Sequence, residues 1–271
     1  MTIVQTLKNI GATAHLHEDG SVTTDGYAAY GGDSNAVQHL LTNVTILAAA
    51  NYAFAALKAD GTVVTWGDPE SGGDSSTVQD LLTAVKTITA TKYAFAALKT
   101  DGTVITWGYP DYGGNSNAVQ DRLTNVTGIA ATGYAFAALK TDGTIVTWGD
   151  PSEGGDSSAV QHLLTDVTKL FSTDSAFTAL KADGSVISWG DPDYGGDSST
   201  VQHLLKGVTT ISANRCAFAV LKADGTVIAW GHPDYGGDSS ALQEKLINIQ
   251  SIIANKNSFT AIKHDGTRIF W

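Results

Sequence analysis

The sequence is poor in cysteine, proline and positive charge. Its 271 residues include one cysteine, Cys216, and five prolines, and 16 lysine and arginine residues stand against 27 aspartate and glutamate residues. A single cysteine excludes an internal disulfide and gives no sign of an oxidising compartment. The net charge of −11 disfavours partners that attract proteins through phosphate, such as nucleic acid or anionic lipid. It favours a cationic partner or a neutral ligand.

Long hydrophobic runs are also missing. No apolar stretch approaches the roughly 18–20 residues that a membrane-spanning helix needs. The first ten residues, MTIVQTLKNI, do not show the basic start and apolar run of a secretory signal. We therefore expect a cytoplasmic protein that does not associate with membranes.

The sequence instead contains a repeat with a fixed step of 41 residues. Its clearest copy is YAFAALKTDGTVITWG at 93–108. The tryptophan that closes the motif recurs at Trp66, Trp107, Trp148, Trp189, Trp230 and Trp271, and Asp25 holds its place in a degenerate first copy. The repeat units are 2–42, 43–83, 84–124, 125–165, 166–206, 207–247 and a shortened 248–271. An array of this size predicts a single repeat domain over 1–271.

Each unit predicts three strands. In the third unit they are Val85–Ala90, Ala94–Lys99 and Thr103–Trp107, and both faces of the last two are largely apolar. A strand buried on both faces fits a stack of sheets such as propeller blades. The Asp-Gly pair between the second and third strands predicts a hairpin turn, because Asp can bind the backbone ahead of it and Gly tolerates positive φ.

A short helix is predicted after the glycine-rich loop that follows each tryptophan. Ser199-Thr200-Val201-Gln202 matches a capping box, Ser/Asn-x-x-Gln, and apolar pairs such as Val201 with Leu205 fall at i and i+4. The unit is therefore predicted to be β-β-β-α, with short helices in the connections between blades. The fold class expected is mainly β, a seven-bladed β-propeller.

The stretch AFAALK-x-DGTVxTWGD resembles the repeat of the regulator of chromosome condensation family. The resemblance covers all seven units and implies that family's seven-bladed propeller. The step of 41 residues is shorter than expected for the family, and the loop after the tryptophan reads Gly-Gly-Asp-Ser-Ser rather than a Gly-Gln-Leu-Gly type. No residue of the family's nucleotide-exchange activity matches a position here. The resemblance therefore carries over the fold and not that activity.

The loops after the tryptophans hold the candidate ligand-binding residues. They are the acidic or amide residues after the Gly-Gly pair, Asp33, Asp74, Asn115, Asp156, Asp197 and Asp238, and the tyrosines before it, Tyr30, Tyr112, Tyr194 and Tyr235. Six similar loops would form a multivalent surface. The simpler interpretation is turn chemistry, in which each Asp makes an Asx-turn. The loop lacks the alternating oxygen ligands and closing Glu of a calcium loop, so no metal or other cofactor is expected.

Candidate catalytic chemistry is sparse. His15 and His17 have a spacing that would allow joint metal ligation, but no third ligand is evident. Arg215 beside Cys216 could lower the pKa of the thiol, yet no matched base accompanies it. Catalysis needs an asymmetric constellation, and near-identical units do not supply one. We expect a protein that is not an enzyme.

Three functional hypotheses follow. The first is a non-enzymatic binding propeller that presents its acidic Gly-Gly-Asp loops to a protein partner. The second is a multivalent lectin-like protein in which linked weak sites gain avidity for a glycan. The third is an enzyme with a site at the seam where a closed ring would join its first and last units. The sequence does not name the ligand, the face used or the oligomeric state, and near-identity of the copies is equally compatible with avidity, recent duplication or design.

Overall fold

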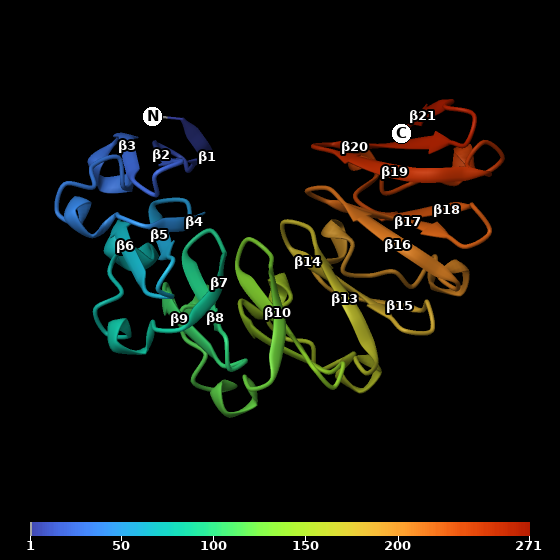
Figure 1. Cartoon of the computed structure of the whole chain (residues 1–271). Helices are drawn as coiled ribbons and strands as arrows, with labels where there is room; N and C mark the ends of the chain where they lie inside the picture. Colours follow the sequence, from blue (N-terminus) through green and yellow to red (C-terminus); the bar gives the residue numbers. More distant parts are fainter. Residues whose placement is uncertain (1) are drawn as a thin grey trace. The chain divides into compact units, whose positions relative to one another are not determined.

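Each repeat forms one three-stranded antiparallel sheet in the computed structural model, which describes residues 2–271 (Figure 1). The described residues hold seven such sheets, and in each one the second strand lies between the first and the third. The first strands are β1 (Ile3–Lys8), β4 (Val44–Ala49), β7 (Val85–Ala90), β10 (Val126–Ala131), β13 (Val167–Ser172), β16 (Val208–Ala213) and β19 (Ile249–Asn255).

The other two strands of each sheet form the hairpin that the Asp-Gly pair predicts. The second strands are β2 (Ala12–His17), β5 (Ala53–Lys58), β8 (Ala94–Lys99), β11 (Ala135–Lys140), β14 (Ala176–Lys181), β17 (Ala217–Lys222) and β20 (Ser258–Lys263). The third strands are β3 (Val22–Gly26), β6 (Val63–Gly67), β9 (Val104–Gly108), β12 (Ile145–Gly149), β15 (Val186–Gly190), β18 (Val227–Gly231) and β21 (Arg268–Phe270). The prediction of a mainly β fold with three strands per repeat is confirmed.

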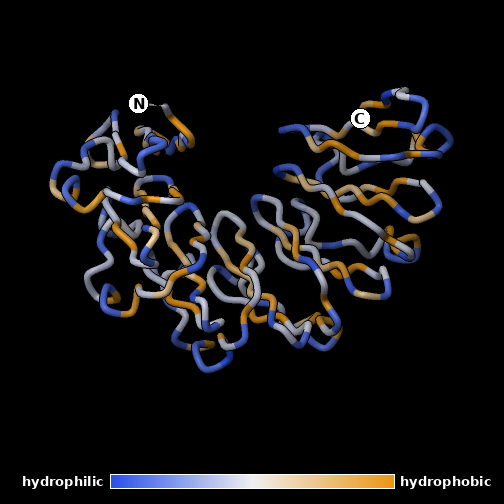
Figure 2. Tube along the Cα trace, in the orientation of Figure 1, coloured by the Kyte–Doolittle hydropathy of each residue, from blue (hydrophilic) through white to orange (hydrophobic). Residues whose placement is uncertain are grey.

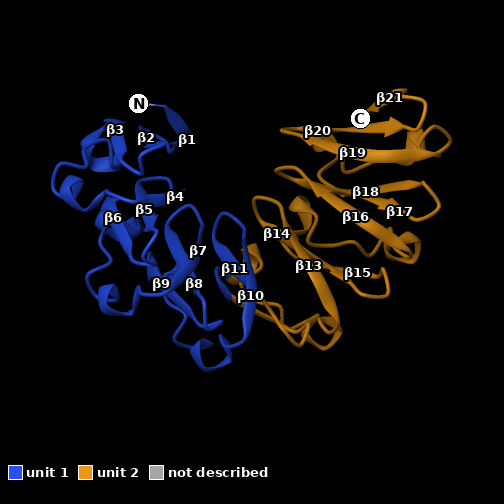
Figure 3. Cartoon of the chain, viewed as in Figure 1, with its two compact units in different colours: residues 1–138, 148–150 blue, residues 139–147, 151–271 orange. Residues whose placement is uncertain are grey.

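Two compact units divide the chain (Figure 3). Unit 1 comprises residues 1–138 and 148–150, and unit 2 comprises residues 139–147 and 151–271. Unit 1 contains β1 to β10, unit 2 contains β13 to β21, and the boundary crosses β11 and β12. Folding of all seven repeats as one cooperative domain remains a prediction.

Successive sheets pack a face of small side chains against a face of large side chains. In unit 1, Ala53, Ala55 and Leu57 on one face of β5 pack in the same core as Phe95 and Trp107 of the next sheet. The opposite face of β5 carries Phe54, which packs on the preceding sheet. The small side chains on one face of a sheet therefore pack against the large aromatic side chains of the next sheet. Along the trace, the apolar stretches of the strands alternate with hydrophilic turns (Figure 2). This complementarity explains why the middle strand is apolar on both faces.

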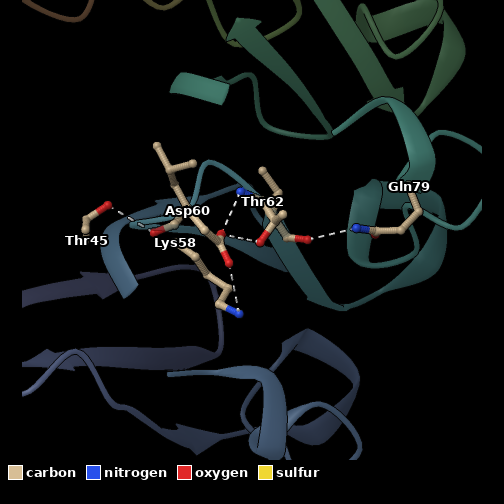
Figure 4. A network of polar contacts seen from close by, with 7 residues as sticks. Thr45, Lys58, Asp60, Thr62 and Gln79 are labelled. Carbon is tan, nitrogen blue, oxygen red and sulfur yellow. Dashed lines mark hydrogen bonds and ion pairs between the residues drawn. The ribbon is translucent and has the colours of Figure 1, made fainter. Parts of the chain in front are cut away.

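The Asp-Gly turn is held by its own side chains (Figure 4). Oδ1 of Asp60 accepts hydrogen bonds from the amide of Thr62 at 3.0 Å and from its hydroxyl at 2.6 Å. Gly61 has φ of +79°, a region that favours glycine. Lys58 Nζ lies 3.8 Å from Asp60 Oδ2, and this ion pair at the surface, with an exposed aspartate and a partly buried lysine, has a small energetic value.

The prediction of helices in the connections is wrong. The described connections contain only short turns. Those before the first strands are Gln38–Leu40, Gln79–Leu81, Gln120–Arg122, Gln161–Leu163, Gln202–Leu204 and Ser240–Leu242. Those after the third strands are Ala28–Tyr30, Pro69–Gly73, Pro110–Tyr112, Pro151–Glu153, Pro192–Tyr194 and Pro233–Tyr235. The interpretation of Ser/Asn-x-x-Gln as the start of a helix is therefore wrong, and the hydrogen bonds of the glutamine side chain explain the difference.

Glutamine in this segment binds the sheet instead of a helix start. Gln79 Nε2 donates to the carbonyl oxygen of Val63 in β6 at 3.1 Å (Figure 4), and its Oε1 accepts the hydroxyl of Ser75 at 2.8 Å. Ala84 then adopts a positive φ of 54°, a conformation that terminates a right-handed helix. The segment therefore ends after one turn and leads directly into β7.

Candidate functional site

Each glycine-rich loop is attached to the following repeat by a tryptophan. Trp107 Nε1 donates a hydrogen bond of 3.0 Å to the carbonyl oxygen of Gly72, 35 residues earlier in the chain. The same 3.0 Å bond joins Trp66 to Gly31, Trp148 to Gly113, Trp189 to Gly154, Trp230 to Gly195 and Trp271 to Gly236. Trp107 stacks on Phe95 with ring centroids 5.3 Å apart and is 3% exposed. Five of these tryptophans are buried in the interface between repeats, and Trp271 is partly buried.

The first glycine of the Gly-Gly pair fits this interface because it has no side chain. Gly72 has φ of +90°, and a Cβ built there would lie 2.7 Å from Cδ2 of Phe95. That separation is too short for non-bonded carbon atoms. The loops are therefore held in one conformation by the next sheet, so residues around them are presented on a rigid support.

The residue after Gly-Gly makes the Asx-turn that turn chemistry predicts. Asp74 Oδ1 accepts the amide of Ser76 at 2.8 Å. The equivalent bond measures 2.9 Å at Asp33, 3.0 Å at Asn115, and 2.8 Å at Asp156, Asp197 and Asp238. This backbone hydrogen bond is the main cause that lowers the pKa of Asp74, and the same cause lowers the pKa of Asp156 and Asp238. All six residues are exposed. Their side chains can therefore contact a partner while they also hold the turns.

A groove of about 840 Å³ lies between the second and third repeats of unit 1. Ile105 and Trp107 line it from the third strand of the third repeat. Carboxylates reach it from two consecutive loops, Glu70 and Asp74 from one and Asp111 from the other. No lysine, arginine or histidine is among the residues that line this groove. The groove therefore combines apolar and uncharged polar side chains with several carboxylates.

A second groove of about 560 Å³ lies one repeat earlier in unit 1. Asp74 borders this groove too, but Lys58 is also part of its wall. The two grooves show that the space between successive loops recurs along the array. Only the larger of the two combines several carboxylates with no basic residue.

The sequence-predicted tyrosines lie beside the loops and not in the larger groove. Tyr30, Tyr112, Tyr194 and Tyr235 end the short turns that follow the third strands. Tyr109, which sequence reasoning did not select, lines the groove and stacks on Tyr112 with ring centroids 4.9 Å apart. The structure therefore brings Asp74, Asn115 and Tyr109 together, and connects Tyr112 to them through Tyr109.

The histidine pair of the first repeat is engaged in local contacts. Nδ1 of His15 lies 3.0 Å from the hydroxyl of Thr6, and its Nε2 lies 3.4 Å from Asp25. His17 Nε2 lies 2.8 Å from the hydroxyl of Thr23. Over residues 2–271, no group of three or more His, Cys, Asp or Glu side chains is arranged to hold a metal ion.

Cys216 does not have the environment of a nucleophile. The residue is buried, and this burial raises the pKa of the thiol. Arg215 pairs instead with Asp174, whose Oδ2 lies 2.9 Å from both Nε and NH2 of the guanidinium. Arg215 does lower the pKa of this thiol, as its position in the sequence suggests, but burial and the charge of Asp174 raise the pKa by more.

In the part of the chain that the structure describes, none of the helices is long and apolar enough to cross a bilayer.

Comparisons with known proteins give structural matches only. No protein-family model matches the sequence, and no curated protein matches it. Human WBSCR16 is 15% identical, with 85% of this chain and 76% of that chain covered and a TM-score of 0.54. Yeast RCC1 (Prp20), in a crystal structure with Kap60 bound, is 18% identical, with 84% of this chain and 69% of that chain covered and a TM-score of 0.51. Together with the seven three-stranded sheets, these likenesses show that the chain has the repeat fold of RCC1-type propellers.

Proposed function

We propose that this chain is a non-enzymatic binding protein that uses its acidic Gly-Gly-Asp loops to hold a protein partner. The observation that carries the proposal is the groove of about 840 Å³ in unit 1, because carboxylates from two consecutive loops line it together with apolar and uncharged polar residues and without a lysine, arginine or histidine. Such a surface attracts basic side chains, and the net charge of −11 adds a long-range attraction for a basic partner.

Support also comes from the rigidity of the loops. The Trp107 to Gly72 hydrogen bond and the Asx-turn at Asp74 fix the loop before any partner arrives. Binding to a preformed surface loses less conformational entropy than binding to a mobile one. The yeast relative has a protein, Kap60, bound in its crystal structure, and we extend protein binding to this chain as part of the proposal.

The test uses the full chain and three labelled peptides of about twelve residues in fluorescence anisotropy titrations. One peptide alternates Lys or Arg with Gly and Ser, one replaces every basic residue with Gln, and one replaces them with Glu. We expect binding of the basic peptide alone, weakening as salt rises from about 50 to 300 mM because exposed ion pairs are screened. Equal binding of the Gln peptide, or binding of none of the three, would refute the proposal.

Site variants locate the binding. Glu70→Gln, Asp74→Asn and Asp111→Asn combined should weaken binding of the basic peptide roughly tenfold, because each exposed ion pair contributes about 0.2–1 kcal/mol. Glu18→Gln, Asp121→Asn and Glu244→Gln form the matched control, since they remove the same charge from exposed residues outside the groove. Equal loss in both variants would show a general charge effect and contradict a groove site.

A lectin-like activity is the alternative outcome. Tyr109, Asn115 and Asn117 line the same groove, a combination of ring and amide that can also bind a sugar. Binding of labelled oligosaccharides in a glycan array, without binding of the basic peptide, would favour this alternative.

A further inference from the structure

Seven of the nine tyrosines in the chain form one connected set of rings in unit 1. We call this set the tyrosine ladder. Its neighbouring ring centroids are 6.0 Å apart for Tyr27 and Tyr30, 4.8 Å for Tyr30 and Tyr52, 5.8 Å for Tyr52 and Tyr93, 5.2 Å for Tyr93 and Tyr112, 6.0 Å for Tyr93 and Tyr134, 4.9 Å for Tyr109 and Tyr112, and 5.0 Å for Tyr112 and Tyr134.

Three positions of the repeat supply all of these rings. Two lie in the short turn after the third strand, and one lies in the turn between the first and second strands. Every tyrosine of the sequence falls at one of these positions, whereas phenylalanine and tryptophan fill the interfaces between sheets. Tyrosine combines an apolar ring with a polar hydroxyl, so its confinement to exposed turns is typical of a recognition surface.

Main-chain hydrogen bonds keep the ladder in register from repeat to repeat. The amide of Asn51 donates to the carbonyl oxygen of Lys92 at 2.8 Å, and the amide of Lys92 donates to that of Gly133 at 2.9 Å. Thr91 Oγ1 also donates to the carbonyl oxygen of Tyr112 at 3.1 Å. Turns from successive repeats are therefore joined directly to one another, and the rings they carry are preorganised.

The ladder is accessible and has acidic neighbours. Tyr27 is 72% exposed and Tyr109 is 37% exposed, and the other five rings are partly exposed. The pKa of Tyr52 is raised, first by Tyr93 and also by the negative charge of Asp68. Burial and then Tyr109 and Asp150 raise the pKa of Tyr112. The phenols of Tyr52 and Tyr112 therefore stay neutral at physiological pH.

One cation already sits on the ladder. Nζ of Lys92 lies 4.5 Å from the ring centroid of Tyr134 and 3.4 Å from its hydroxyl oxygen. An ammonium group at this distance over a tyrosine face makes a cation–π interaction. The chain itself thus demonstrates which kind of group this surface accepts.

Unit 2 lacks such a surface although its repeats have the same fold. The equivalent positions hold Glu153, Ser175 and Cys216, and its two tyrosines, Tyr194 and Tyr235, make no tyrosine–tyrosine ring contact among the described residues. The ladder is therefore not a requirement of the repeat fold. Its restriction to unit 1 gives an internal control.

We propose that the tyrosine ladder of unit 1 binds an extended basic segment of a protein partner, with lysine or arginine side chains lying over its rings. This inference rests on the proposed function, because Tyr109 belongs both to the ladder and to the acidic groove and makes the two surfaces continuous. Rings from successive turns are repeated along the surface, which suits a segment with basic side chains at intervals.

The test compares ring chemistry at Tyr52 and Tyr93, which belong to the ladder and do not line the groove. The full chain is titrated with the labelled basic peptide by fluorescence anisotropy. Tyr52→Leu with Tyr93→Leu should weaken binding about five- to twentyfold, because leucine has no π face. Tyr52→Phe with Tyr93→Phe should stay within about twofold of the native chain. Phe270→Leu in unit 2, which replaces an exposed aromatic ring outside the loops and the ladder, is the control and should leave binding unchanged.

A variant that gains affinity guards against loss through misfolding. Lys92→Met frees the face of Tyr134 and should strengthen binding at least about threefold, whereas Lys86→Met, which removes the same charge from an exposed residue of β7, should strengthen it less. The ladder proposal is overturned if the Leu pair binds as well as the Phe pair, or if Lys92→Met and Lys86→Met behave alike. If the groove variant loses binding while the Leu pair does not, the ladder is wrong and the proposed function stands. If no basic peptide binds, or an oligosaccharide binds instead in a ladder-dependent way, both are overturned.

Discussion

Trp107 Nε1 and the carbonyl oxygen of Gly72 are joined by a hydrogen bond of 3.0 Å between consecutive repeats. Phe95 stacks on the indole of Trp107 and lies close to Gly72, so these three residues pack together in the interface. The same pair recurs at six interfaces. Buried hydrogen bonds are costly to leave unmade, so this pair holds both the register of the array and the position of each loop.

Replacement of this tryptophan should destabilise the chain. Trp107→Phe removes the indole N–H, leaves the carbonyl oxygen of Gly72 without its hydrogen-bond donor and creates a cavity. Together these changes should lower the free energy of unfolding by about 2–4 kcal/mol. We expect a fall of several degrees in Tm by circular dichroism. Trp271→Phe, at the half-buried end of the chain, is the control and should have a smaller effect. Equal, negligible shifts for both variants would show that the bond contributes little.

The conformation of Gly72 predicts a second stability effect. Gly72→Ala places a Cβ at φ of +90° and 2.7 Å from Phe95, at a cost of about 2–4 kcal/mol. Gly128→Ala in β10 is the control, because a Cβ there meets no atom within 4 Å. Chemical denaturation should show a large loss of unfolding free energy for Gly72→Ala and less than about 1 kcal/mol of change for Gly128→Ala. The reverse order would contradict the packing described.

The turn aspartates predict a pH-dependent contribution to stability. Hydrogen bonds from the Thr hydroxyl and then the Thr amide lower the pKa of Asp60, Asp101 and Asp142. A carboxyl whose pKa is lower in the folded chain stabilises it above the unfolded pKa of about 3.9, and this contribution is lost as the pH falls through the folded pKa.

The comparison is between the native chain and a variant with Asp→Asn at positions 60, 101 and 142. The native chain should have the higher Tm at pH 6, and the difference should shrink as the pH falls below the unfolded pKa of about 3.9 and through the lower folded pKa, where the aspartates become protonated. A difference in Tm that grows on acidification would show that the pKa shifts have the opposite sign.

Cooperative unfolding of all seven repeats is a further prediction. Each interface between repeats is built alike, so no interface between them offers an obvious weak point. Differential scanning calorimetry should give one transition whose calorimetric and van't Hoff enthalpies agree. Two resolved transitions would show that units 1 and 2 unfold separately.

Much of the fold follows from the sequence, because the repeat samples each position several times. Val85–Ala90 and Ala94–Lys99 are strands with the bounds that their apolar pattern predicts, and the Asp-Gly pair makes the turn. The prediction of a helix in each connection is wrong for a physical reason. The pattern around Gln79 matches a capping box, but the glutamine side chain binds the carbonyl oxygen of Val63 instead. A capping-box rule considers only four consecutive residues, so it cannot take into account a hydrogen bond to a strand 16 residues earlier.

The candidate site is only partly predictable. Asp74 and Asn115 stand out through their register, and the structure places both in one groove. The ladder was missed because Tyr52 and Tyr93 are 41 residues apart and meet only through packing of successive repeats. The signal that could have revealed it is compositional, since all nine tyrosines fall at three positions of the repeat.

The most direct test of the proposed binding surface is photo-crosslinking. A basic peptide that carries a photoreactive amino acid is irradiated with the full chain, and the attachment sites are mapped by mass spectrometry. The groove and ladder predict cross-links concentrated in residues 69–81, 105–120 and the turns at Tyr52 and Tyr93. Cross-links distributed equally over the loops of both units, or concentrated in those of unit 2, would contradict it.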